Sequence, residues 1–353
     1  MKLKCLTRFF ILFLCLFLAG CESLSYYRQA ILGQLSILSK REAIEKLIAD
    51  ETSPPELKNK LQTILELRSF AETELRLPVG DNFDSYVDVE RPFVVWNVFA
   101  SPEFSIRPIN WCYPVAGCVS YRGYFSEADA QTFASSKRAE GLDVYVGGVS
   151  AYSTLGWFAD PVLSTVIWRD DEQLAALLFH ELAHRLVYIP GDTEFNESFA
   201  TTMEREGLRR WLSARGVDSA DVVLQSAFST KAREDFVRLV ESTVHSLQEV
   251  YGNAETDEVQ KRHAKAEVFA RMRRDYESLK QSWNGYDAYD AWMSRDLNNA
   301  QLGTVGTYNN WVPSLELILR ENDDDLPRFY DAIAKLSDLS ADERAHILSS
   351  KGR

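Results

Sequence analysis

The chain has 353 residues, of which 46% are hydrophobic and 26% are charged, as in an ordinary globular protein. This composition excludes a low-complexity chain, a collagen-like chain and a protein with several membrane spans. With 39 Lys and Arg residues against 52 Asp and Glu residues, the formal net charge is −13. An acidic chain lacks the basic surface that non-specific nucleic-acid binding requires, so we expect no nucleic-acid partner.

The first 20 residues have the layout of a secretory signal peptide. Three basic residues precede an apolar run from Phe9 to Leu18, which is too short to span a bilayer comfortably. The sequence Leu18-Ala19-Gly20-Cys21 that follows resembles the lipobox of bacterial lipoproteins. That resemblance implies cleavage before Cys21 and acylation of this cysteine, and several acyl chains give a stable membrane anchor. The alternative is a cleaved signal peptide or an uncleaved anchor with a chance cysteine.

The expected mature chain begins at Cys21. Loss of the three basic residues of the signal takes the formal net charge from −13 to −16. Position 22 is Glu22, and not the Asp that retains such lipoproteins at the inner membrane. We therefore expect a lipid-anchored protein of the cell envelope that faces the periplasm, with the outer membrane favoured.

The cysteine content agrees with export. Two of the five cysteines lie in the signal and a third is Cys21, which leaves Cys112 and Cys118. An even pair so close together suits a local disulfide in an oxidising compartment, and two free thiols are the alternative. A thiolate metal site would need a second cysteine pair, which the chain lacks.

Hydrophobic spacing predicts the following elements in chain order. Helices are expected between Ser25 and about Leu77, with a break at 52–55. Strands are expected at 87, 93–99, 115–121, 143–149 and 164–168, with a helix over about 126–140 among them. A strong helix from Glu172 to Tyr188 follows, then helical patterns over 196–251 and 257–280 and two last helices near 315–319 and 327–336.

This order of elements predicts an α+β fold that is predominantly α, with a small mixed sheet. We divide the chain into a signal peptide over 1–20, an N-terminal helical segment over 21–80 and one domain over 81–353. In that domain the sheet and the helix ending near Tyr188 belong to a part that extends to about residue 215, and the remainder is helical.

The most specific chemical motif is His180-Glu181-Leu182-Ala183-His184. Because residues i and i+4 share one helix face, His180 and His184 can bind one zinc ion together. Glu181 is turned toward the open side of the ion, where its carboxylate can take a proton from a water whose pKa zinc lowers to about 7. The alternative is an amphipathic helix with two surface histidines.

A catalytic zinc site takes a third protein ligand. The chain turns back after the motif, and Glu197 lies in the first turn of an expected antiparallel helix, thirteen positions after His184. Glu194 and Glu204 are the rival ligands, although Glu204, two turns beyond Glu197, is far along the helix axis and could instead orient a histidine. We expect one zinc ion per chain, bound by the two histidines and Glu197.

The histidine motif followed by Asn196-Glu197-Ser198-Phe199-Ala200 resembles the gluzincins, in which two histidines and a glutamate bind zinc. Together with the lipobox, the segments 147–156, 160–163 and 300–313 resemble a family of bacterial lipoproteins called "putative aminopeptidases". The resemblance covers most of the mature chain. It implies a zincin-like active-site helix packed on a small sheet, with His180, His184 and Glu197 as ligands and Glu181 as the catalytic base.

Peptide hydrolysis also needs a donor for the developing oxyanion, which a tyrosine or histidine usually supplies. Tyr308 lies in a loop after the long helices and is our candidate for this catalytic role, with Tyr152 as the alternative.

The sequence therefore predicts a zinc-dependent peptidase that acts on a peptide or protein substrate, an aminopeptidase by family resemblance. Two other functions fit the same motifs. One is a zinc-containing envelope lipoprotein that acts as a scaffold or binding protein without peptidase activity. The other is a metal-dependent amidase of cell-wall peptides.

Overall fold

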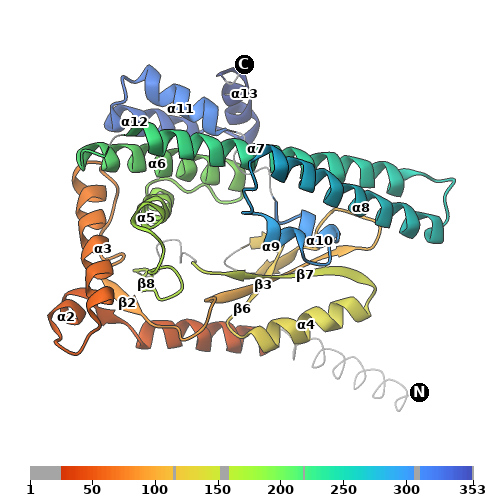
Figure 1. Cartoon of the computed structure of the whole chain (residues 1–353), viewed down its shortest axis with the longest axis horizontal. Coiled ribbons are helices and arrows are strands. Elements are labelled where there is room, and N and C mark those ends of the chain that lie inside the picture. Colours follow the sequence, from red (N-terminus) through yellow and green to blue (C-terminus); the bar gives the residue numbers. More distant parts are fainter. Residues whose placement is uncertain (1–24, 114–116, 152–158, 218, 306–310, 352–353) are drawn as a thin grey trace, which may run out of the picture.

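The computed structural model describes residues 25–113, 117–151, 159–217, 219–305 and 311–351. Within these ranges the chain is mostly helical, and its strands form only short sheets of two or three strands (Figure 1). The predicted fold class, α+β and predominantly α, is therefore confirmed. None of the described helices combines the length and the apolar character needed to cross a bilayer.

The sheets are formed by the first half of the chain. One sheet is mixed, because β2 (Ser85–Val87) is antiparallel to β1 (Glu42–Ala43) and parallel to β8 (Val162–Leu163). In the other, β3 (Val95–Pro102) lies between β6 (Arg122–Tyr124) and β7 (Leu142–Val149) and is antiparallel to both. The strands β4 (Trp111–Tyr113) and β5 (Gly117–Val119) form a separate hairpin.

Helices flank the strands in the first half of the chain and account for all the elements after β8 in the described residues. After a helix over 25–39, they are α2 (Ile44–Ala49), α3 (Pro55–Thr73), α4 (Glu127–Ala139), α5 (Asp171–Leu186), α6 (Thr193–Ala214), α7 (Ser219–Gly252), α8 (Glu258–Ser282), α9 (Asp290–Met293), α10 (Asn299–Leu302), α11 (Val312–Glu321), α12 (Leu326–Ser337) and α13 (Ala341–Lys351).

The largest hydrophobic core surrounds α5. It joins buried residues of α3, α5, α6, the β1–β2–β8 sheet and the three C-terminal helices. Phe70 of α3 and Phe179 of α5, for example, have ring centroids 6.0 Å apart. The helices before residue 80 thus share a core with the helix that carries the histidine motif.

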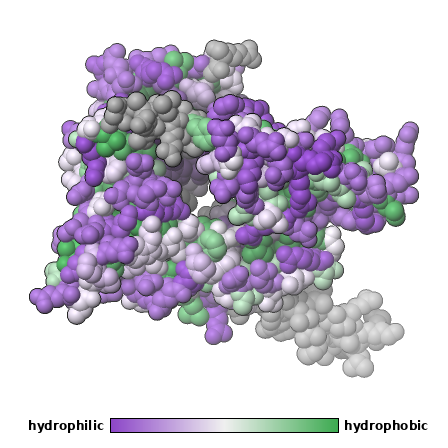
Figure 2. All heavy atoms as spheres, viewed as in Figure 1, coloured by the Kyte–Doolittle hydropathy of each residue, from purple (hydrophilic) through white to green (hydrophobic). Residues whose placement is uncertain are grey.

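The described residues also form two smaller hydrophobic cores. The β6–β3–β7 sheet packs against α4, whose N-cap Ser126 accepts a hydrogen bond from the backbone of Asp129. The long helices α7 and α8 pack side by side and share a core with residues 283–302. Figure 2 shows that hydrophilic side chains dominate the visible surface over α7 and α8.

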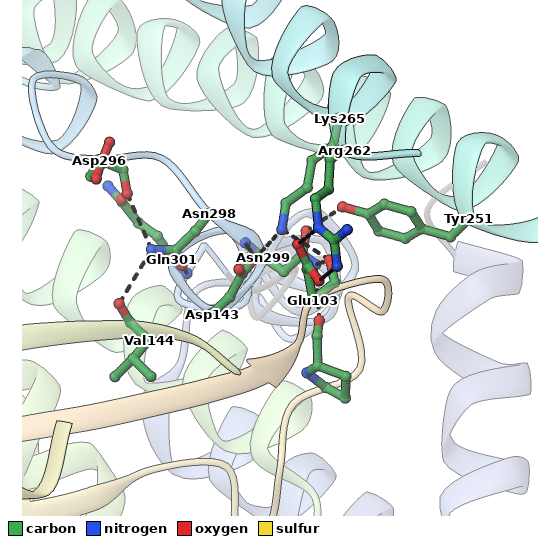
Figure 3. A network of polar contacts seen from close by, with 11 residues as sticks. Glu103, Asp143, Val144, Tyr251, Arg262, Lys265, Asp296, Asn298, Asn299 and Gln301 are labelled. Carbon is green, nitrogen blue, oxygen red and sulfur yellow. Dashed lines mark hydrogen bonds and ion pairs between the residues drawn. The ribbon is translucent and has the colours of Figure 1, made fainter. Parts of the chain in front are cut away.

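A polar network ties the α7–α8 pair to the β6–β3–β7 sheet (Figure 3). Arg262 of α8 binds both carboxylate oxygens of Glu103, at 2.6 and 2.8 Å. Lys265 donates to Asp143 of β7 at 2.6 Å, and the same carboxylate accepts from the backbone of Asn299. These contacts join segments that are far apart in the sequence, so they fix where the α7–α8 pair lies.

The strand predicted at Ser164–Trp168 is wrong. These residues form a turn after β8, closed by hydrogen bonds from the backbone of Val166 and Ile167 to the carbonyl of Leu163. Val166 and Ile167 are buried in the large core as part of this turn. The β-branched residues in 164–168 therefore indicate that part of this segment is buried, and not that it pairs as a strand.

Two helical predictions also need correction. The pattern over 196–251 forms two helices, because the chain breaks near Gly216, which adopts a positive φ of 65°. The C-terminal part holds a third helix, α13, that apolar spacing did not indicate. Its buried residues are only Arg344 and Leu348, so it has little hydrophobic pattern to find.

Candidate metal centre

The helix α5 presents the histidine motif. It begins where the sequence predicts, because the Asp170 side chain caps it by accepting a hydrogen bond from the backbone of Gln173 at 2.7 Å. It ends at Leu186, slightly before the predicted Tyr188. Apolar side chains on the inner face of α5, such as Leu178, are fully buried. This packing holds the helix, and with it the two histidines, in a fixed place.

The turn from α5 to α6 positions the third candidate ligand. The buried side chain of Asn196 both accepts from the backbone N–H of Ile189 and donates to its carbonyl, each at 2.8 Å. Asp192 caps α6 by accepting from the backbone of Phe195. Since α6 begins at Thr193, Glu197 lies in the second turn of the helix, and not in the first turn as predicted.

Three side chains of α5 and α6 converge on one point. Nε2 of His180 lies 3.2 Å from Nε2 of His184 and 3.4 Å from Oε2 of Glu197. Nε2 of His184 lies 3.6 Å from Oε1 of Glu197. Among the described residues, this is the group of His, Cys, Asp and Glu side chains whose ligand atoms are close enough together to hold a metal ion.

These separations fit a zinc ion. Two ligand atoms that each lie about 2.1 Å from zinc at a tetrahedral angle are about 3.4 Å apart. The three observed distances scatter around that value, and two imidazoles with one carboxylate are a donor set that zinc takes in catalytic sites. The residues present therefore fit the metal that the sequence predicts.

Glu204, the rival ligand that could instead orient a histidine, lies beside His180. Its Oε2 is 3.0 Å from Nδ1 of His180, the ring nitrogen that does not face the other two side chains. A carboxylate at that atom fixes the tautomer and the ring orientation, which leaves Nε2 of His180 free to act as a ligand. Glu194, the other rival, is not part of the group that could hold a metal.

The family model described as "Putative aminopeptidase" matches residues 25–348, which is most of the chain. The chain belongs to this family. No curated protein and no solved structure was found to match the chain. Membership of this family suggests peptidase activity and implies a peptide substrate.

In this family member, the charges at the convergence point favour a cation. Burial opposes a charge on His180, but the carboxylates of Glu197 and Glu204 outweigh it and raise the pKa of His180 to about 10. Burial and the neighbouring His180 lower the pKa of His184. Burial also opposes the charge on Glu197, yet its contact with His180 holds the pKa of Glu197 below the ordinary value. The carboxylates of Glu197 and Glu204 therefore stabilise a positive charge at the histidines, whether a proton or a metal ion carries it.

Glu181 lies half-buried beside this group. Burial raises its pKa to about 6, with Glu197 and Asp160 adding to the shift and His180 opposing it. The charges that act on its carboxylate thus come from α6 as well as from the buried Asp160, which precedes β8. A carboxylate whose pKa is raised toward neutrality is suited to proton transfer.

The remaining predicted site residues lie elsewhere. Tyr308, Tyr152 and Cys21 lie outside the residues that the structure describes. Cys112 and Cys118 are joined by a disulfide across the β4–β5 hairpin, with their Cα atoms 3.8 Å apart.

Two residues support the site in ways that the sequence analysis did not predict. Asn196 appeared only as the neighbour of Glu197, although an Asn beside a turn is a residue type that often bonds to nearby backbone. Gly207 of α6 lies against α5, where a Cβ atom would come within 2.6 Å of the Phe179 ring. A glycine inside a predicted helix is the signal that could have indicated this close approach.

Proposed function

We propose that this protein is a zinc-dependent peptidase, with His180, His184 and Glu197 as ligands and Glu181 as general base. The observation that carries the proposal is the convergence of the three ligand atoms at 3.2, 3.4 and 3.6 Å, with Glu181 next to His180 on the same helix. Membership of the aminopeptidase family supports the reaction class. The substrate profile decides whether the enzyme releases the first residue of a peptide or cleaves an internal bond.

The bound zinc ion would supply Lewis-acid chemistry, polarising the scissile carbonyl and lowering the pKa of water. The residues of the chain carry out the proton transfers. Glu181 takes a proton from the attacking water and delivers it to the nitrogen of the leaving amine. Glu204 acts on His180 alone, by holding its ring through Nδ1. Tyr308, or in its place Tyr152, is the proposed donor to the oxyanion.

We also propose that Cys21 is acylated and anchors the enzyme in the cell envelope, facing the periplasm, with the outer membrane favoured. The lipobox that ends at Cys21 supports this proposal. The disulfide between Cys112 and Cys118 agrees with an oxidising compartment. Mass spectrometry of the protein from membranes would test it, since an unmodified cysteine or an uncleaved signal contradicts the proposal.

The experiment that tests the peptidase proposal is hydrolysis of a pool of unstructured peptides by zinc-loaded protein. We expect Glu181→Gln to retain zinc and to lose hydrolysis by a factor of about 10² to 10⁴. Glu172→Gln is the matched control, because Glu172 is an exposed carboxylate on the first turn of the same helix. It should keep full activity.

Two results would contradict the peptidase proposal. One is hydrolysis by Glu181→Gln at the rate of the unchanged chain. The other is an unchanged chain that binds zinc and cleaves nothing in the pool. Sequencing of the products by mass spectrometry separates removal of the first residue from internal cleavage, and a chelator control shows whether hydrolysis needs the metal.

A further inference from the structure

The helix over residues 25–39 packs against the rest of the protein mainly with one side, and Tyr27 at the margin of the other side contacts the ring of Tyr113. On that inner side, Gln29 donates to the carbonyl of Gly123 at 3.2 Å and accepts from the backbone of Phe125 at 3.1 Å. A Cβ atom on Gly33 would lie 2.2 Å from the Phe125 ring, so the helix backbone touches this ring directly. Ile37 is 2% exposed. The helix is therefore held firmly in place by its inner side.

The outer side of the same helix is apolar and exposed. Tyr27, Ile31 and Leu35 follow each other at intervals of four residues and form one stripe, with Leu32 beside it. Their side chains are 38%, 58%, 53% and 54% exposed, respectively. The other large apolar side chains that are exposed in the described ranges are scattered along the sequence. A contiguous apolar stripe on a firmly packed helix indicates a surface that contacts something else.

The charges around the stripe indicate what it contacts. Residues 25–41 contain three basic residues and no acidic one, within a chain of net charge −13. Lys40 pairs with Glu90 and Arg41 donates to the carbonyl of Ala159, both on the protein side. Arg28 is exposed, and its position in the helix places it among the apolar residues of the outer side. Apolar side chains with a basic residue and no acid match the surface of an anionic membrane.

The position of the helix in the chain points the same way. Its first residue, Ser25, comes four residues after Cys21, and four extended residues span at most about 14 Å. An acyl anchor on Cys21 would therefore hold this helix at the bilayer surface. Figure 1 draws the helix in red along the bottom edge of the molecule, on the side away from α6 and the C-terminal helices. Contact with a membrane along this edge leaves α6 and the C-terminal helices clear of the lipid.

We propose that the outer side of this helix lies on an anionic lipid surface. The side chains of Tyr27, Ile31, Leu32 and Leu35 insert among the headgroups, and the guanidinium of Arg28 pairs with lipid phosphate. The helix thus acts as a second membrane contact beside the lipid anchor and sets the orientation of the protein on the bilayer. This contact is independent of the peptidase activity.

The test is vesicle binding by a chain of residues 22–353, which carries no acyl group. All the described helices, strands and cores lie within this range. We expect sedimentation with vesicles that contain phosphatidylglycerol, weaker binding at high salt, and little binding to phosphatidylcholine alone. Because Ile31 and Leu35 are about half exposed, the double variant Ile31→Ser/Leu35→Ser should bind about 25-fold more weakly, roughly fivefold per side chain.

A matched control is Val259→Ser, which removes an apolar side chain that is 71% exposed on α8. It should leave vesicle binding unchanged, and the circular dichroism spectrum of each variant should match that of the unchanged chain, which shows that a loss of binding is not a loss of the fold. Arg28→Glu should abolish the preference for anionic vesicles.

The proposal is overturned if the unchanged chain binds no vesicles, or if Ile31→Ser/Leu35→Ser binds as well as the unchanged chain. It is also overturned if the unchanged chain is a dimer in solution that the double variant converts to a monomer. That result assigns the outer side of the helix to a second copy of the chain.

Discussion

Replacement of Glu204 removes the carboxylate that holds the second ring nitrogen of His180. In the structure, Oε2 of Glu204 lies 3.0 Å from Nδ1 of His180, and neither atom belongs to the converging ligand group. We therefore expect a change in zinc affinity without loss of any ligand. Glu204→Ala removes the bond, whereas Glu204→Gln keeps a neutral oxygen that can still accept it.

The size of the effect follows from the bond. A hydrogen bond to a charged group contributes about 1.5–3 kcal/mol. The Glu204 side chain is 36% exposed, so solvent screens the bond and the lower end applies. A loss of about 1.5 kcal/mol in Glu204→Ala corresponds to roughly tenfold weaker zinc binding, in the range known for partners of metal-bound histidines. A neutral bond is about half as strong, so Glu204→Gln should weaken binding by about threefold.

The assay is competition for zinc between the metal-free protein and a chelating dye, with the unfolding temperature measured in parallel. Glu316→Gln is the matched control, because Glu316 has a similar exposure of 33% and binds Arg205, the neighbour of Glu204 on α6, at 3.1 Å. It should leave zinc affinity unchanged. Equal zinc affinity in Glu204→Ala and the unchanged chain would refute the assigned role of Glu204.

Three further predictions concern the packing around α6. Gly207→Ala should lower stability by about 1–3 kcal/mol in denaturant unfolding, because its Cβ would press on the Phe179 ring; unaltered stability would contradict this close contact. Arg344→Leu should cost about 3 kcal/mol, since it removes the buried guanidinium that pairs with Asp192; a cost below about 1 kcal/mol would argue against this. Burial favours a neutral Glu206, yet hydrogen bonds from two arginines outweigh it and hold the pKa of Glu206 below its ordinary value. The stabilisation that ionised Glu206 gives the folded protein is therefore fully present above the ordinary pKa of a glutamate. It is lost as the pH falls through the lowered pKa of Glu206. Glu206→Gln should cost about 1–2 kcal/mol at pH 7 and progressively less as the solution is acidified, and a cost that is constant with pH would contradict the argument.

The histidine pair could be predicted from the sequence because its geometry is local. Residues four apart share a helix face in any α-helix, and the Asp170 cap and the apolar residues of α5 indicated that helix clearly. The sequence did not determine as clearly which of Glu194, Glu197 and Glu204 is the third ligand. All three lie on α6, and their distances to the histidines depend on how α6 packs against α5.

That packing is set by features with weak sequence signals. The side chain of Asn196 fixes the turn before Glu197 through two bonds to Ile189, and Gly207 lets the two helices approach. Neither residue belongs to a recognisable motif. The same limit explains the wrong strand at 164–168 and the missed helix α13. Apolar spacing reports which residues are buried, whereas the turn holding Ile167 and the buried Arg344 depend on tertiary contacts.

The most direct test of the zinc site is the metal content of the chain of residues 22–353, in its unchanged form and as His184→Ala and Glu197→Ala. Our account predicts one zinc ion per unchanged chain and its loss in both variants. Zinc retained by Glu197→Ala would contradict the assigned third ligand and move that role to Glu194 or Glu204. An unchanged chain that binds no zinc would contradict the metal centre itself.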